Sequence, residues 1–101
     1  RASAVAATGR GEEMIRSCGS FLGVELMRNG RSPQEACEDV CKRIIDINGG
    51  PSKVDFNDKI VALSKSGEVG CAAIRGKKGQ EPEVATWSKK GLKVTKGTYL
   101  I

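Results

Sequence analysis

The residues of this chain that could do chemistry lie close together near its beginning, in the segment Thr8-Gly9-Arg10-Gly11. The small apolar residues 3–7 before it predict a short buried strand, and Glu12 and Glu13 after it carry the negative charge that favours a helix start. Because glycine has no Cβ, such a turn can point backbone N–H groups outward, where they bind anions or stabilise an oxyanion formed during a reaction. The Thr8 hydroxyl adds one more donor.

Two other kinds of chemistry do not fit this turn. Gly9-x-Gly11 lacks the third glycine of a dinucleotide-binding fingerprint, and the chain has no Gly-Lys-Ser/Thr of a P-loop. Thr8 is not the nucleophile, because its own nitrogen is in a peptide bond and the chain has no histidine to act as a base. The turn therefore predicts an oxyanion site or, alternatively, a strand-to-helix connection without a chemical role.

The cysteine pattern argues against a metal centre. Cys37 and Cys41 lie one helical turn apart, Cys18 and Cys71 belong to other elements, and no Cys-x-x-Cys pair occurs. Without histidine, a zinc site would need all four thiols from three separate elements. We interpret the cysteines as small buried hydrophobic residues and expect no metal and no other cofactor.

The positive charge is concentrated toward the end of the chain. The net charge is +5, and residues 75–96 hold seven basic residues, Lys77 and Lys78 among them, against Glu81 and Glu83. Only Trp87 could stack on a base there, so we interpret the segment as a lysine-decorated strand edge rather than a nucleic-acid site. A basic, non-catalytic binding module stays open as an alternative of another class. No apolar run approaches the length of about 18 residues that a membrane helix needs, so we expect no membrane partner.

A first helix is predicted over residues 12–28, followed by Asn29-Gly30 as a left-handed cap. Gly19 and Gly23, four residues apart, would let another backbone approach this helix closely. The side chains expected to face inward are Met14, Ile15, Cys18, Leu22 and Leu26, with Phe21 as a further candidate.

A second helix is predicted from the segment Ser32-Pro33-Gln34-Glu35, in which Ser32 is the N-cap and Glu35 completes a capping box. Gly49-Gly50-Pro51 ends it, and the short connection predicts that the two helices pack antiparallel. The side chains expected to face inward are Ala36, Cys37, Val40, Cys41, Ile44 and Ile47.

The strands predict an α+β fold. Lys59–Ser64 and Val69–Ile74 flank a short turn that contains Gly67, which is typical of a hairpin. A third strand is predicted at residues 84–88, and residues 92–101 form a basic tail with room for one more. The order β-α-α-β-β-β indicates one partial domain over residues 1–101, with a helix pair packed on an antiparallel sheet. Four aromatic residues allow only a modest core, which another chain or further sequence would complete.

The turn and the two helices together resemble the β-subunit of glycosylasparaginases, which are N-terminal-nucleophile (Ntn) hydrolases of the asparaginase family. The resemblance is carried by Ala7-Thr8-Gly9-x-Gly11-Glu12-x-x-x-Arg16 and by Val-Glu-Leu-Met-Arg-x-Gly-x-Ser-Pro-x-Glu-Ala-Cys over residues 24–37. It is continuous over residues 6–45, weaker over residues 59–74 and thin beyond Gly76. Isoaspartyl peptidases share the Thr-Gly-x-Gly-Glu turn, so isoaspartyl dipeptidase or L-asparaginase activity stays open beside glycosylasparaginase.

The resemblance implies roles for three residues. Thr8 and Gly9 match the pair that supplies a hydroxyl and a backbone N–H to the carbonyl oxygen of the scissile amide, the oxyanion hole, and Gly11 would let the substrate approach. The family's nucleophile is a threonine at the start of the β-subunit, and its Gly-Arg-x-Gly-Asp-Ser segment binds the substrate's α-carboxylate and α-amine. Neither is found here, so the chain resembles the downstream portion of a β-subunit, and we expect it to be inactive alone.

The resemblance also implies partners. The expected assembly is an αββα sandwich made by autocatalytic cleavage of a precursor, in which this chain supplies one helix layer and strands of one sheet. The α-subunit and the remainder of the β-subunit would complete it, as an (αβ)2 heterotetramer acting on glycoasparagine or another β-aspartyl substrate. The location would be lysosomal, periplasmic or secreted for a glycosylasparaginase and cytoplasmic for an isoaspartyl peptidase, and the sequence does not decide between them.

Overall fold

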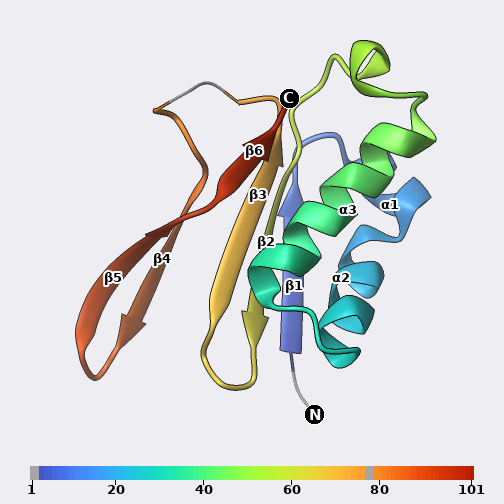
Figure 1. Ribbon diagram of the computed structural model, residues 1–101. Coiled ribbons are helices and arrows are strands. Elements are labelled where there is room, and N and C mark those ends of the chain that lie inside the picture. Colours follow the sequence, from blue (N-terminus) through green and yellow to red (C-terminus); the bar gives the residue numbers. More distant parts are fainter. Residues whose placement is uncertain (1–2, 77–78) are drawn as a thin grey trace.

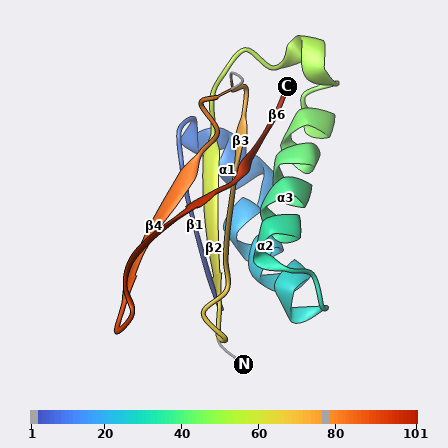
Figure 2. The ribbon, with the colours of Figure 1, turned by 60° about the vertical axis from the view of Figure 1, so that its left-hand side comes forward.

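Helices and strands form separate layers in the computed structural model, which describes residues 3–76 and 79–101, and this arrangement confirms the α+β class. The helices of the described residues lie on one face of a four-stranded sheet (Figure 1). A two-stranded hairpin leaves the sheet on the other side (Figure 2). Lys77 and Lys78, part of the predicted basic segment, lie outside the described residues.

The four-stranded sheet has the order β1-β2-β3-β6. Its strands are β1 Ser3–Thr8, β2 Lys59–Ser64, β3 Val69–Ile74 and β6 Thr98–Leu100, and the separate hairpin consists of β4 Glu83–Ser88 and β5 Gly91–Lys96. The predicted β2–β3 hairpin is confirmed. The prediction of an antiparallel sheet is confirmed for β1, β2 and β3 and wrong for the last strand, because the basic tail forms two strands and the second, β6, returns parallel to β3.

The register of the sheet decides which side chains share a face. Cross-strand partners point to the same side of a sheet and alternate along each strand. Ala7 is paired with Ile60, which faces the helices, whereas Thr8 is paired with Lys59 on the opposite side. We call the side of β1 and β2 that faces away from the helices the open face. Its residues are Ala4, Ala6, Thr8, Lys59, Val61 and Leu63.

The first helix differs from the prediction, because it is broken at Cys18 into α1 Gly11–Ser17 and α2 Gly19–Arg28. Cys18 adopts a left-handed conformation with φ of 53°. The break leaves the Ser17 carbonyl free of the helix, and it accepts a hydrogen bond of 3.2 Å from Arg43 Nε.

The break also changes which side chains face inward. Met14, Leu22 and Leu26 pack against the core as predicted, but Cys18, Ile15 and Phe21 are exposed, the last two at 79% and 69%. Gly23 does permit a close approach, although it is the Val5 side chain, and not a backbone, that occupies the space beside it.

The second predicted helix is confirmed as α3 Pro33–Ile47. Ser32 Oγ accepts from the Glu35 N–H at 3.1 Å, and Glu35 Oε1 accepts from the Ser32 N–H at 3.0 Å, which completes the capping box. A short 3-10 turn, Pro51–Lys53, follows. The inward face differs at one position, because Ile45 is buried and Ile47 only half-buried. The core consists of Cys37, Val40, Cys41, Ile44, Ile45, Val54, Phe56, Ile60, Ala62, Ala72 and Ile74.

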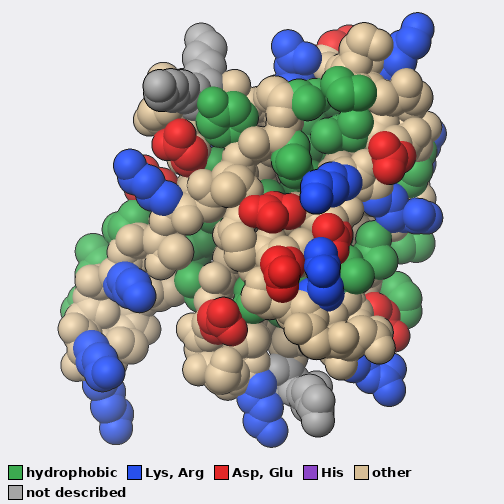
Figure 3. All heavy atoms as spheres, viewed as in Figure 1, with side chains coloured by type: hydrophobic (Ala, Val, Ile, Leu, Met, Phe, Trp, Pro, Cys, Tyr) green, Lys and Arg blue, Asp and Glu red, His purple; other side chains and the backbone are tan. Residues whose placement is uncertain are grey.

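Strand β1 is not the buried strand that its apolar sequence predicts. Within the described residues it pairs only with β2, and Ala4, Ala6 and Ala7 are exposed. Figure 3 shows basic side chains along the β4–β5 hairpin, and the sequence identifies them as lysines. There Lys93 and Lys96 are exposed, in agreement with a lysine-decorated strand edge.

Candidate functional site

The candidate site lies where β1 ends. Thr8 is the last residue of the strand, Gly9 makes the turn, and α1 begins two residues later at Gly11. Gly9 has a φ of +116°, which residues with a side chain rarely adopt. A Cβ at Gly9 would also collide with Asp58 Oδ1 and the Asn57 carbonyl. The turn therefore requires glycine at this position for its shape.

Asp58 stabilises the turn through a hydrogen bond to its backbone, a role that no sequence pattern predicts. The residue is fully buried, and its Oδ1 accepts a hydrogen bond from the Arg10 N–H. Its carbonyl accepts from the Ile74 N–H at 2.8 Å, which ties the support to β3. Within the described residues Asp58 Oδ2 has no partner, and burial raises the pKa of this carboxyl above its ordinary range.

Arg10 is fixed to the same loop by its side chain. Its guanidinium carbon lies 4.8 Å from the centre of the Phe56 ring, in a cation–π contact. Phe56 is itself buried in the core. Both the backbone and the side chain of Arg10 are therefore anchored, and the turn before it has little freedom to move.

The donors predicted for the oxyanion hole are open. Within residues 3–76 and 79–101, neither the Thr8 hydroxyl nor the Gly9 N–H has a hydrogen-bond partner. Both residues are exposed, so this pair of neighbouring donors on a rigid turn is accessible to an incoming oxygen. The structure brings the two donors together at the end of β1.

Gly11 differs from Gly9 in the space around it. No atom of the described residues lies within 4 Å of the position that a Cβ would occupy there, and its φ is not positive. The fold therefore has no need of glycine at residue 11. The approach of a substrate across Gly11 stays a prediction.

Thr8 lines a groove of about 270 Å³ on the open face, which we call the Thr8 groove. Its floor comes from β1, β2 and β3, and its wall from the segment that leads into β4. The lining residues are Ala6, Ala7, Thr8, Lys59, Ile60, Val61, Cys71, Pro82 and Glu83. Lys59 and Glu83 also line an adjoining polar hollow of about 470 Å³. The two charges at the groove were not singled out from the sequence, where no motif marks them.

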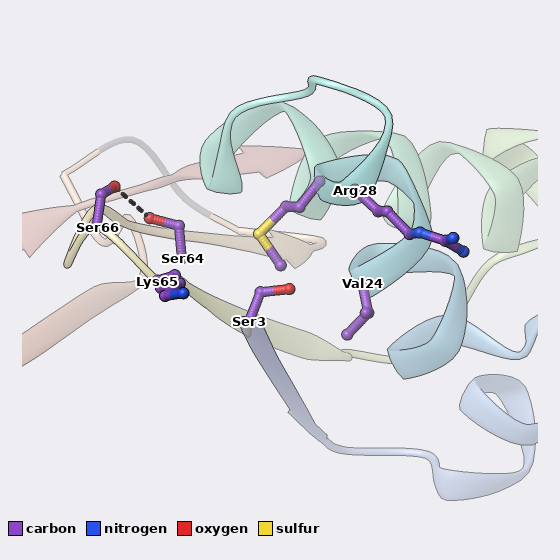
Figure 4. Close-up of a pocket in the computed structure, with 7 residues that line it drawn as sticks. Ser3, Val24, Arg28, Ser64, Lys65 and Ser66 are labelled. Carbon is purple, nitrogen blue, oxygen red and sulfur yellow. Dashed lines mark hydrogen bonds between the residues drawn. The ribbon is translucent and has the colours of Figure 1, made fainter. Parts of the chain in front are cut away.

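A hollow of about 480 Å³ at the other end of β1 is larger but offers no chemistry (Figure 4). Ser64 and Ser66 hydrogen-bond to each other at 2.9 Å, and the Arg28 guanidinium contacts Glu25 at 3.4 Å. None of the residues predicted for the oxyanion site lines this hollow, so the candidate site is the smaller Thr8 groove.

The remaining titratable groups serve the fold. Burial raises the pKa of Cys37 and of Cys41 to about 12, so both thiols are protonated and unreactive. All four cysteines are free, and only Cys18 is exposed, against the expectation of burial. The described residues contain no cluster of three potential metal ligands. Their helices are too short or too polar to cross a lipid bilayer.

Glu13 is buried beside the turn and is fully paired. Its carboxylate accepts from Asn48 Nδ2 at 2.8 Å and from Arg16 Nη1 at 3.0 Å. The Asn48 hydrogen bond, more than the Arg16 contacts, holds the pKa of Glu13 below its ordinary range. This network joins α1 to the end of α3, so it is structural.

Comparison with known proteins identifies relatives over most of the chain. A profile of the family described as asparaginase matches residues 1–84. The N(4)-(β-N-acetylglucosaminyl)-L-asparaginase of Elizabethkingia miricola is 45% identical over 74 residues, which are 71% of this chain and 22% of that protein.

Insect proteins give similar matches. A putative N(4)-(β-N-acetylglucosaminyl)-L-asparaginase of Drosophila grimshawi is 42% identical over 68% of this chain and 16% of its own length. An L-asparaginase-like protein of Drosophila sechellia is 34% identical over 60% of this chain and 14% of its own length. The chain thus spans about a fifth or less of the length of these relatives.

Proposed function

The chain belongs to the asparaginase family of Ntn hydrolases, as a partial region similar to glycosylasparaginases, and we propose that it supplies the oxyanion hole of a β-aspartyl amidohydrolase. The proposed substrate is N4-(β-N-acetylglucosaminyl)-L-asparagine, which the names of the relatives favour. The observation that carries the proposal is the rigid turn on which the Thr8 hydroxyl and the Gly9 N–H lie side by side, without a hydrogen-bond partner among the described residues.

The proposed chemistry needs these donors when charge develops on the substrate. Attack on the side-chain amide turns its carbonyl oxygen into an oxyanion, and a preorganised hydroxyl and N–H stabilise that charge without first having to reorient. Removing one such donor typically costs about 2.7–4 kcal/mol of transition-state stabilisation. Asp58 and Phe56 contribute by holding the turn in place.

Other groups must supply the nucleophile and the base. Thr8 has no free amine, and the chain contains no histidine. In the proposed assembly an N-terminal threonine of the remaining β-subunit provides both functions, since its own amine activates its hydroxyl.

The open face is suited to a second sheet from the α-subunit. Leu63 is 46% exposed there, and Ala4 and Ala6 lie beside it without cover from the described residues. Packing of two sheets would bury this surface and give the αββα sandwich and the (αβ)2 assembly expected for the family.

A comparison of the chain alone with the complete enzyme tests the proposal. We expect the chain alone to release no product from a chromogenic aspartyl anilide, and the complete enzyme, in which the chain is joined to the nucleophile-bearing segment and the α-subunit, to hydrolyse it. Turnover by the chain alone at the same rate, with contamination excluded, would refute the division of roles. An inactive but folded complete enzyme would refute the function.

A further inference from the structure

The carboxyl of Asp58 lies against the backbone of the proposed oxyanion hole. A Cβ at Gly9 would collide with Asp58 Oδ1, and the same oxygen accepts a hydrogen bond from the Arg10 N–H. The Asp58 side chain is also fully buried, so water does not screen it from the turn. Any charge on this carboxyl therefore acts on the Gly9 N–H and on an oxygen that is bound there.

Asp58 and Glu13 are both buried, but they differ in how their oxygens are paired. Both oxygens of Glu13 accept hydrogen bonds, which come from Asn48 and Arg16. Within the described residues Asp58 Oδ2 has no partner. Burial of an ion with an unpaired oxygen costs much more than burial of a neutral carboxyl. The hydrogen bonds thus favour an ionised Glu13 and a protonated Asp58.

Charges on neighbouring elements also act on the Asp58 carboxyl. On α1, Glu12 and Glu13 oppose its ionisation, whereas the N–H and the guanidinium of Arg10 favour it. On α3, Cys41 adds no charge, because burial raises the pKa of its thiol to about 12. Burial of Asp58 itself is the largest cause, and the pKa of this carboxyl lies above its ordinary range.

The cations of the neighbouring strands do not neutralise Asp58. Lys59 follows it in β2 but is exposed on the open face. Arg75, directly after β3, donates from Nη1 to the Val54 carbonyl at 2.9 Å. Among the ion pairs of residues 3–76 and 79–101, none joins either cation to Asp58. An ionised Asp58 would therefore carry a charge without an ion-pair partner.

Such a charge would matter most during the reaction. In the proposed function a negative oxygen forms at the Thr8 hydroxyl and the Gly9 N–H, and a carboxylate against Gly9 would repel it. A neutral carboxyl causes no such repulsion. The carbonyl oxygen of the bound substrate is uncharged before the attack, so the effect of the charge falls on kcat rather than on KM.

We propose that Asp58 is a positioning residue that works in its protonated form: the neutral carboxyl holds the Arg10 N–H and with it the turn, and ionisation of the carboxyl weakens the oxyanion hole. The inference rests on the proposed function and adds regulation by pH to it. The proton passes to solvent when the carboxyl ionises, so no further reactant is needed.

The ratio of kcat between a neutral variant and the wild type isolates this carboxyl. Asp58→Asn keeps an acceptor for the Arg10 N–H and stays neutral at every pH, and titrations of the nucleophile and the substrate cancel in the ratio. In the complete enzyme, with the chromogenic aspartyl anilide, we expect a ratio of about 1 at pH 5 that rises to about 10 at pH 9, with KM unchanged. Asp55→Asn, which removes an exposed carboxyl from the same loop, is the control, and its ratio should stay near 1.

The outcomes separate the inference from the function on which it rests. An Asp58→Asn ratio that is constant, or that falls as the pH rises, would overturn the inference, because a purely structural role does not produce the rise. An equal rise for Asp55→Asn would overturn it too, since the effect would then not be specific to the buried carboxyl. If melting temperatures show that Asp58→Asn does not fold, Asp58→Ser, which is also neutral and has an acceptor, takes its place in the same test. A folded wild-type enzyme that does not hydrolyse the anilide would overturn the proposed function instead.

Discussion

The two faces of one sheet differ in how far this chain completes them. On the helix side, Ile60 and Ala62 are each 2% exposed beneath α3 and α2. On the open face of the same strands, Leu63 is 46% exposed. The chain therefore folds around one face and leaves the other, which carries Thr8, for contact with another part of the enzyme or with substrate.

The polar groups of the two sides differ in the same way. Glu13, on the helix side, is buried with its oxygens paired to Asn48 and Arg16. At the site the Thr8 hydroxyl and Asp58 Oδ2 have no partner within the described residues. A buried polar group without a partner costs stability, which applies to Asp58, whereas the exposed Thr8 hydroxyl is accessible to solvent or to a ligand.

Truncation of Ile44 should have the largest effect on the helix side. Ile44 is fully buried between α3 and the sheet, so Ile44→Ala should lower the free energy of unfolding of the chain by about 2–5 kcal/mol. Leu63→Ala on the open face is the matched control and should cost less than about 1 kcal/mol. Urea unfolding measures both. Equal losses would mean that the open face is packed in solution, and the contrast between the faces would fail.

Removal of the Thr8 hydroxyl should have the largest effect on the open face. In the complete enzyme, Thr8→Val keeps the shape of the side chain but loses the donor, so kcat should fall by about 10²–10³ with little change in KM. Thr8→Ser should retain much of the rate. The melting temperatures of both variants must match that of the wild type before the rates are compared. A folded Thr8→Val enzyme with unchanged kcat would mean that the turn is only a structural connection between β1 and α1.

The helix side could be predicted from local sequence signals. The capping box of Ser32 and Glu35 and the Gly67 turn between β2 and β3 are short-range patterns, and each fixes its element without help from the rest of the chain. Thr8, Gly9 and Gly11 were also located from sequence, because a strand, two glycines and a helix start follow one another.

The features that escaped prediction depend on contacts distant in sequence. The break at Cys18 is stabilised by Arg43, and the support of the turn comes from Asp58, 48 residues after Arg10. β6 depends on pairing with β3. Periodicity describes one element at a time, so it shows neither a helix broken by a tertiary hydrogen bond nor a buried carboxyl that arrives from another loop.

The Glu13 network should have a smaller, pH-dependent effect. Its pKa is lowered in the folded chain, so the stability it contributes is present above the ordinary range of a glutamate and is lost as the pH falls through the lowered value. Glu13→Gln should therefore cost about 1 kcal/mol at neutral pH and less in acid. Denaturant melts from pH 7 to pH 3 measure the difference, which should shrink toward acid.

The stability contributed by Asp58 should depend on pH in the opposite direction to that contributed by Glu13. Its pKa is raised by burial, so its contribution is fully present below the ordinary range of an aspartate and is lost as the pH rises through the raised value. The stability of Asp58→Asn, which keeps an acceptor for the Arg10 N–H, should improve relative to wild type as the pH rises. Parallel trends for the two variants would contradict the assignment of one paired and one unpaired carboxyl.

Gly11→Ala should have the smallest effect on stability. It tests whether glycine at this position is required for folding or for substrate binding. Space is open around Gly11, and alanine at a compatible helix position removes freedom from the unfolded chain, so stability should stay the same or rise by up to about 1 kcal/mol. If substrate approaches the turn across this residue, KM in the complete enzyme should nevertheless rise. Gly9→Ala, which would collide with Asp58, should instead destabilise the chain. Unchanged kinetics in a Gly11→Ala enzyme would remove Gly11 from the site, because a methyl group that neither strains the fold nor meets the substrate shows that nothing there requires glycine.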